Sequence, residues 1–335
     1  MSGSFRFFAV ASALAVLTAC SSSPRIGELP SLPKDLPPDF QAKFNVVEPD
    51  GSPRKAAPAP AAKAELARGK RLSRKKKGSA RAAPTPFAYP NRRPKIDPIW
   101  VGERQVLEIT YIGMRAGEFT LDVLPMKEIA GRKVYHLRAR ALTSSMMNLF
   151  YRLDDTIESF WDYETLFSHR FHLVLDETKQ KRDALELFDA EAKKAFYWDR
   201  RNHVDKGASE TKATFDIEPA FPQDSFTALY YMRTLPLEDG KAYTFPVVSE
   251  GKSWEAVVTV VRRETLDTPL GRKRCVVVKP QTRFNGVLKQ ERGDSFIWLT
   301  DDDRRFIVRL EAQVKVGSVA AQMKSVELGE KPNEQ

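Results

Sequence analysis

A period of two in the apolar side chains, sustained over most of the chain after residue 98, constrains this sequence more than any other feature. Leu107, Ile109 and Tyr111 alternate with polar neighbours. The pattern recurs at Phe119, Leu121 and Val123; Tyr135, Leu137, Ala139 and Ala141; Phe171, Leu173 and Leu175; Tyr243, Phe245 and Val247; Trp254, Ala256, Val258 and Val260; and Phe306, Val308 and Leu310. Strands of this kind turn one face to a core and the other to water, as in antiparallel sheets. Roughly a dozen such strands, at the spacing of a meander, sandwich or barrel, predict an all-β fold.

One short helix is predicted among the strands. Asp224 can serve as its N-cap, and Pro236 would end it. One face of this helix carries Phe226, Leu229, Tyr230 and Arg233. Because many twisted antiparallel strands curl, split into two sheets or close, we expect a large, curved antiparallel sheet or barrel with this helix packed on or in it. A two-sheet sandwich is the alternative.

The composition changes near residue 98, and this change predicts the domain organisation. Residues 21–98 contain 14 of the 22 prolines, and residues 54–95 hold 14 Lys or Arg against one acid, Glu65. Such a segment buries too little apolar surface to offset its ordering entropy, so we expect disorder. The predicted parts are a signal peptide (1–19), a disordered basic tether rich in proline (20–98), an antiparallel β domain (99–328) and a C-terminal tail (329–335).

The N-terminus predicts export. Arg6 precedes a mostly apolar run, Phe7 to Leu17, which is too short to span a bilayer but suits a signal peptide. The next residues, Leu17-Thr18-Ala19-Cys20, resemble a bacterial lipobox, which implies cleavage between Ala19 and Cys20 and attachment of lipid to the Cys20 thiol. The alternative is an ordinary secretory signal that contains a Cys. Ser21 stands where lipoproteins kept at the inner membrane often carry Asp, so we expect an outer-membrane lipoprotein that faces the periplasm.

The basic part of the tether has two interpretations. Residues 68–84 carry eight Lys or Arg and no acid, and the net charge of +10 therefore belongs to the tether rather than to the nearly neutral β domain. An exported chain would not meet nucleic acid, but the segment could contact anionic lipid or peptidoglycan. The contact residues would be Arg68, Lys70, Arg71, Arg74, Lys75, Lys76 and Lys77. The alternative is a solvated spacer that its charge keeps extended.

Four stretches resemble one known family. They are VGERQVLEITYIGMRAGEFTLDV from Val101, DSFTALYYMRTLPLEDGK from Asp224, TPLGRKRCVVVKP from Thr268 and IWLTDDDRRFIVRLEAQVKVGSVAAQM from Ile297. In this order they resemble the "domain of unknown function 3108" family over about residues 100–328. The resemblance implies an exported, β-rich envelope protein and implies no activity. One departure is Ile307, where the family often carries Pro.

The residues that could carry chemistry do not group into a motif. His169 and His172 are three positions apart on an expected strand, so they would point to opposite faces as solvated histidines. Asp301-Asp302-Asp303 is typical of a hairpin turn, and Asp154-Asp155 of a strand end with solvated charge. The domain contains no nucleophile elbow, phosphate loop or dinucleotide fingerprint. We therefore expect no catalytic residue, no metal and no cofactor.

The two cysteines and the tryptophans complete the candidates. If Cys20 is acylated, Cys275 has no disulfide partner, and its strand-like surroundings predict a small buried hydrophobe. Four tryptophans lie in expected strands: Trp161, Trp198, Trp254 and Trp298. On one inner face they would form an apolar wall for an acyl chain or a polymer; the alternative is that they fill the core.

Together these features favour an envelope lipoprotein whose β domain binds a lipid, glycan or protein partner without catalysis. A structural tether or scaffold between membrane and peptidoglycan is the first alternative. An envelope hydrolase is the second.

Overall fold

The computed structural model describes residues 38–49, 87–284, 287–289, 294–313 and 317–331. The predicted signal peptide, Cys20 and the basic residues 68–77 lie outside the described residues. The segments 38–49 and 87–98, which the sequence assigns to a disordered tether, pack on the β domain instead. The boundary predicted at residue 98 therefore falls inside the folded unit.

The strands belong to one antiparallel sheet. Their bounds are β1 (Val101–Tyr111), β2 (Met114–Ile129), β3 (Arg132–Thr143), β4 (Leu153–Asp162), β5 (Ser168–Glu177), β6 (Gln180–Asp189), β7 (Lys194–His203), β8 (Gly207–Asp216), β9 (Ala242–Ser249), β10 (Lys252–Thr268), β11 (Gly271–Phe284), β12 (Val287–Lys289), β13 (Ser295–Thr300), β14 (Ile307–Gln313) and β15 (Ser318–Glu330). The sheet order is β8-β7-β6-β5-β4-β3-β2-β1-β15-β14-β13-β11-β10-β9, with β12 paired to β11. The predicted all-β, antiparallel fold is confirmed.

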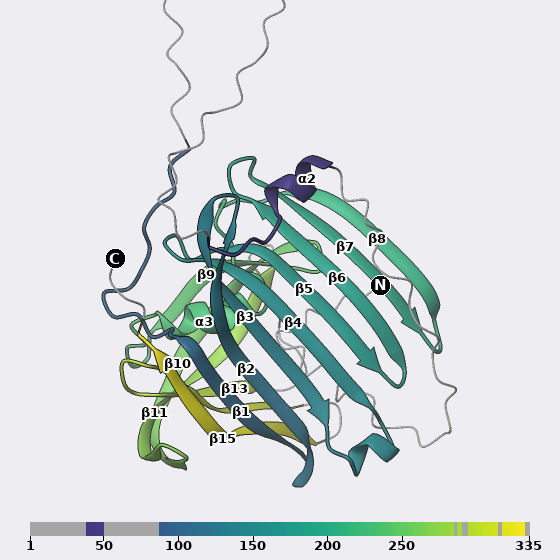
Figure 1. Cartoon of the computed structure of the whole chain (residues 1–335). Coiled ribbons are helices and arrows are strands. Elements are labelled where there is room, and N and C mark those ends of the chain that lie inside the picture. The colour runs from purple at the N-terminus through teal and green to yellow at the C-terminus, as the bar shows by residue number, and fades with distance from the viewer. Residues whose placement is uncertain (1–37, 50–86, 285–286, 290–293, 314–316, 332–335) are drawn as a thin grey trace, which may run out of the picture.

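The sheet is strongly curved, and its two edge strands do not pair with each other. Figure 1 shows β1 to β8 along one wall and β9 to β15 along the other. The chain between β8 and the following helix bridges the gap: Pro222 O accepts the Ser168 N–H at 3.1 Å, and Gln223 O accepts the Val248 N–H at 2.8 Å. A short stretch of irregular backbone thus joins β5 to β9, and the curved sheet becomes barrel-like without closing.

Helix α3 (Thr227–Arg233) lies inside the curve near one end of the sheet (Figure 1). The predicted capping by Asp224 is confirmed, since Asp224 Oδ1 accepts the N–H groups of Phe226 and Thr227 at 2.7 Å each. Nearly every residue of α3 is buried, so the helix is enclosed rather than amphipathic. Tyr230 and its neighbours join the main core, which lines the concave face of the sheet.

The convex face is covered by apolar clusters at two places. Helix α2 (Pro38–Lys43) and the residues after it place Phe40, Phe44 and Val46 against a set of strand residues. That set is Ile129, Val134, Phe160, Leu185, Leu187 and Phe196. Strands β2, β3, β4, β6 and β7 therefore carry apolar residues on the convex face here, which explains why α2 packs on them. On the other wall Cys275, Trp298 and Phe306 belong to a second convex cluster.

Candidate functional site

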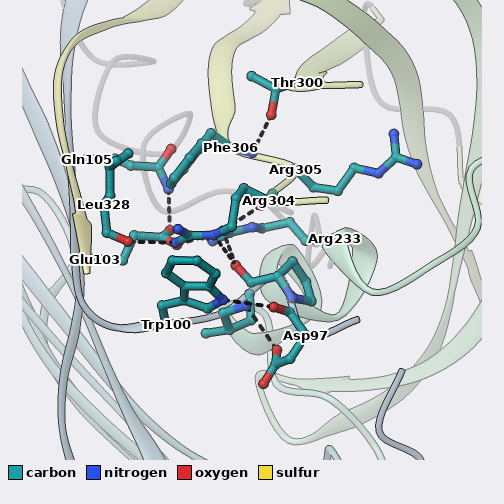
Figure 2. A network of polar contacts seen from close by, with 12 residues as sticks. Asp97, Trp100, Glu103, Gln105, Arg233, Thr300, Arg304, Arg305, Phe306 and Leu328 are labelled. Carbon is teal, nitrogen blue, oxygen red and sulfur yellow. Dashed lines mark hydrogen bonds and ion pairs between the residues drawn. The ribbon is translucent and has the colours of Figure 1, made fainter. Parts of the chain in front are cut away.

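A buried ionic network joins the N-terminal segment, β1, α3 and the β13–β14 turn (Figure 2). Glu103, 1% exposed, accepts hydrogen bonds from Arg233 at 2.7 and 2.8 Å and from Arg304 at 2.8 Å. Gln105 donates to the same carboxylate at 2.7 Å and accepts the Ile307 N–H at 2.9 Å. Two guanidinium groups thus share one carboxylate beneath the protein surface.

Backbone carbonyls complete this network. Arg233 donates to Pro98 O at 3.1 Å and to Arg304 O at 3.0 Å. Arg304 donates to Leu328 O at 2.8 Å and stacks on the Trp100 ring, 3.7 Å from its centroid. Burial alone would lower the pKa of Arg233, but the Glu103 carboxylate raises it. The network fastens distant segments together and presents no free reactive group.

A second set of buried ionisable groups lies on the concave face of β4 and β5. Asp155 follows the strand alternation between Leu153 and Ile157, both of which are in the main core. Glu177 faces it from β5 and accepts a hydrogen bond from the Tyr151 hydroxyl at 2.5 Å. Burial, together with the nearby Glu177 carboxylate, raises the pKa of Asp155 to about 9. The prediction of a solvated charge at Asp154-Asp155 is therefore wrong for Asp155, which keeps its proton at neutral pH.

Glu186 on β6 is a further buried carboxyl group on the concave face. It accepts the Gly251 N–H at 3.3 Å, and burial raises its pKa to about 8. Arg182 lies beside it and pairs with Asp199 at 2.7 Å and with Glu250 at 3.1 Å. The β9–β10 turn thereby docks on β6 and β7, and perturbed pKa values of this kind mark a candidate site.

The two histidines of β5 are held by different carboxylates. His169 is buried, and its Nε2 lies 2.9 Å from Asp162, which also accepts two hydrogen bonds from Arg132 at 2.5 and 2.8 Å. Burial lowers the pKa of His169, so the ring is neutral at neutral pH. His172 lies 2.8 Å from Asp183 and is partly exposed. The prediction of solvated histidines is thus wrong for His169.

These histidines do not assemble a metal site or a catalytic triad. Within the described ranges, no group of three or more His, Cys, Asp or Glu residues could hold a metal ion. Ser168 donates to Asp224 at 2.6 Å, whereas the adjacent His169 bonds to Asp162. Because neighbouring strand residues point to opposite faces, the serine and the histidine belong to separate hydrogen-bonded pairs.

The tryptophans do not form one wall. Trp161 and Trp254 belong to the main core, and Trp298 belongs to the convex cluster around Cys275. Trp198 packs edge-to-face on Phe196, which contacts the α2 cluster on the convex face. The inner wall predicted from all four is not formed, because Trp198 and Trp298 occupy strand positions that face outward.

The remaining sequence candidates among the described residues lie where the patterns predict. Cys275 is a free, buried thiol whose pKa burial raises to about 11. Asp302 lies in the β13–β14 turn and accepts the Arg304 and Arg305 N–H groups at 3.1 and 3.2 Å. Ile307 has a role that Pro could not fill, since its N–H is the donor to Gln105 in the Glu103 network.

Fold and site together define an antiparallel β protein whose curved sheet encloses one helix and several buried ion pairs. The chain belongs to the family of proteins of unknown function DUF3108, whose model matches residues 106–324. The resemblance found in the sequence is thereby confirmed. No curated protein matches the chain.

The comparison with solved structures finds similarities that are distant in sequence. A β-barrel-like protein of the DUF1849 family from Brucella abortus is 11% identical, with 68% of this chain and 98% of that chain covered and a TM-score of 0.46. A candidate lipoprotein from Parabacteroides distasonis is 10% identical over 70% of this chain and 99% of its own, with a TM-score of 0.32. A candidate exported protein with a YmcC-like fold from Bacteroides fragilis is 11% identical over the same shares, with a TM-score of 0.32. Within the described residues, no helix is long and apolar enough to cross a membrane.

Proposed function

We propose that the protein is a lipoprotein of the bacterial cell envelope, attached through Cys20 to the outer membrane and facing the periplasm. Its β domain binds a lipid, glycan or protein partner without catalysis. The observation that carries this proposal is the Leu17-Thr18-Ala19-Cys20 motif at the end of a short apolar run, ahead of a folded domain. Two or three acyl chains on Cys20 would hold the chain on a membrane for practical purposes.

The geometry of the β domain favours binding over catalysis. The buried carboxylates at Glu103 and Asp162 are each paired with arginine, and the Ser168 hydroxyl is bonded to a carboxylate rather than to an imidazole. A nucleophile needs an adjacent base within hydrogen-bond reach, and Ser168 has none in the described site. This arrangement supports a stable display domain.

Fractionation of cells on a density gradient tests the proposed location. The wild-type chain is expected in the outer-membrane fraction, and the Cys20→Ser variant is expected to be strongly depleted from that fraction. Native mass spectrometry of the protein extracted from membranes would then identify the class of bound partner. Recovery of both proteins in the same soluble or inner-membrane fraction would contradict the proposal.

A second candidate function, a scaffold between membrane and peptidoglycan, is favoured by the basic residues of the tether. Eight Lys or Arg without an acid in residues 68–84 suit an anionic polymer. Deletion of residues 68–77 is expected to reduce pull-down by peptidoglycan sacculi at low salt, whereas a neutral segment of equal length tests charge separately from reach. Unchanged retention of both variants would leave the basic segment as a spacer.

A further inference from the structure

One end of the curved sheet carries apolar side chains that the fold leaves in solvent. The connections β1–β2, β3–β4 and β5–β6 all lie at this end. The exposed apolar residues in and beside the first two connections are here called the apolar end; they are Ile112, Met114, Leu142, Met146, Leu149 and Phe150. In the described part of the chain, Leu149 and Phe150 are the most exposed large apolar residues, at 82% and 69%. Figure 1 shows these connections at the end of the sheet opposite α2.

The β3–β4 connection presents its apolar side chains in a fixed orientation. Its short helix η1 (Met147–Leu149) begins beside Ser144, whose hydroxyl accepts the Met147 N–H at 3.3 Å. Met147 packs against the main core, and Tyr151 on the other flank is buried with its hydroxyl on Glu177. Leu149 and Phe150 lie between these two inward anchors and point away from the core. Ser144 N also donates to Ala116 O at 2.8 Å, which fixes the connection to β2.

The β1–β2 turn carries an apolar residue at a position that disfavours it. Ile112 and Gly113 have φ values of 49° and 75°, as a two-residue hairpin turn of type I′ requires. Asn-Gly is the preferred pair in such a turn, because a β-branched residue at positive φ is strained. The turn therefore does not explain Ile112. One side of Ile112 lies over Gly317, and an apolar partner for the exposed half of the side chain would explain the rest.

We propose that the apolar end inserts into the surface of a lipid bilayer, as a second membrane contact besides Cys20. The interaction surface is convex and small, since it consists of side chains from two turns, whereas a stable protein interface takes about 20–30 residues from each partner. Half-exposed Arg115, Arg140 and Arg152 lie in or near these turns, where each also pairs with a carboxylate, of Glu108, Asp154 and Asp176 respectively. Long cationic side chains in this position can reach head groups while apolar neighbours enter the acyl boundary.

The length of chain before the β domain allows this orientation, a step that rests on the proposed function. Residues 21–37 separate Cys20 from Pro38, and a chain of this length spans at most about 60 Å. Strand β4, which runs between the two ends of the sheet, has 10 residues and is about 33 Å long. A membrane that holds Cys20 is therefore within reach of the apolar end, even though α2 packs at the opposite end.

Vesicle binding by the mature chain with Cys20→Ser tests this contact independently of lipidation. Phosphatidylcholine vesicles carry no net charge, so the basic tether contributes little to flotation. Burial of each apolar side chain in the bilayer is expected to raise vesicle affinity about tenfold. The Leu149→Asn/Phe150→Asn double variant should therefore bind about 100-fold more weakly. Ile112→Asn should also weaken binding while leaving the melting temperature unchanged or higher, because Asn suits the turn. Leu328→Asn, at a residue 51% exposed on β15 at the other end, is the matched control and should bind like the parent.

A fluorescent probe locates the contact directly. Cys275 is buried, so in the Cys20→Ser background an environment-sensitive dye can be attached selectively to Leu149→Cys or to Leu328→Cys. The dye at residue 149 is expected to shift to the blue and to be quenched by brominated lipid, and the dye at residue 328 to do neither. Equal quenching at both positions, absence of flotation, or flotation that requires anionic lipid and ignores the apolar substitutions would overturn the proposal. Concentration-dependent dimerisation abolished by the same substitutions would assign the apolar end to a second copy of the chain instead and would also overturn it.

Discussion

Neutralising Glu103 should destabilise the β domain more than removing either of its arginine partners. In Glu103→Gln, Arg233 stays fully buried and Arg304 mostly buried, and neither guanidinium can escape its burial by losing a proton at neutral pH. Breaking a buried pair by removing one partner costs about 3–5 kcal/mol. In Arg233→Met the carboxylate keeps Arg304, so we expect a smaller loss of about 2–3 kcal/mol. For a domain of this size, the loss expected for Glu103→Gln lowers the melting temperature by about 6–20 °C.

Thermal and urea unfolding followed by circular dichroism measures these changes. The matched control is Glu118→Gln, because Glu118 also pairs with a Lys and an Arg, Lys324 and Arg115, but lies on the partly exposed convex face. Exposed pairs contribute about 0–1 kcal/mol. The double variant Glu103→Gln/Arg233→Met should recover part of the loss, since it also removes the fully buried guanidinium and leaves only Arg304 without its carboxylate. A Glu103→Gln variant no less stable than Glu118→Gln would refute the assignment of the network as the fastening between α3, β1 and the β13–β14 turn.

The other predictions concern buried groups elsewhere in the β domain. Because the pKa of Asp155 is raised to about 9, the folded state binds more protons than the unfolded state between about pH 4 and pH 9, so stability should fall as pH rises through this window, by at most about 1.4 kcal/mol per pH unit. Asp155→Asn should flatten this dependence in urea titrations from pH 5 to pH 9, and an unchanged slope would contradict the raised pKa. Gly251→Ala should lower the free energy of unfolding by about 1–3 kcal/mol, since φ is +70° and the added Cβ would lie 2.8 Å from Tyr197 Cδ1. Gly240→Ala is the control, because it has the same φ and nothing within 4 Å of the added Cβ. Equal losses of stability in the two variants would exclude the clash with Tyr197. Phe44→Ala should weaken the docking of segment 38–49 on the β domain by about 3 kcal/mol. Limited proteolysis should then cleave this segment faster than in the wild-type chain. An unchanged cleavage rate would contradict the packing of α2.

Strands with one face on the core and one face in solvent could be predicted from the sequence. Strands that are exposed or buried on both faces could not. The alternation at Leu107 and Tyr111 lies in β1, where one face meets the core and the other water. Strand β8 is exposed along its length because it is an edge strand, so no apolar period marks it. Strand β6 buries apolar residues on both faces, Leu185 and Leu187 under α2 on the convex face and Ala184 and Phe188 in the main core. The pattern is lost wherever tertiary contacts change the number of buried faces.

The buried site residues were also predictable only where local pattern, rather than tertiary contact, decides their environment. Asp155 shares the parity of Leu153 and Ile157, so the alternation placed it inward, but the general preference of carboxylates for solvent favoured the opposite interpretation. In the sequence pattern Arg233 shares a helix face with Leu229 and Tyr230, and a charged residue among apolar ones indicates a buried partner. That partner, Glu103, is 130 positions away, and only the folded topology brings the two together.

The mass of the N-terminal peptide of the mature protein, recovered from membranes, tests the central claim most directly. The account predicts a chain that begins at Cys20 and carries diacylglycerol on its thiol. It also predicts that Cys20→Ser loses this modification and sediments with membranes much more weakly, since only the apolar end then remains as a contact. A Cys20→Ser chain that keeps the same mass addition and the same membrane association would contradict it.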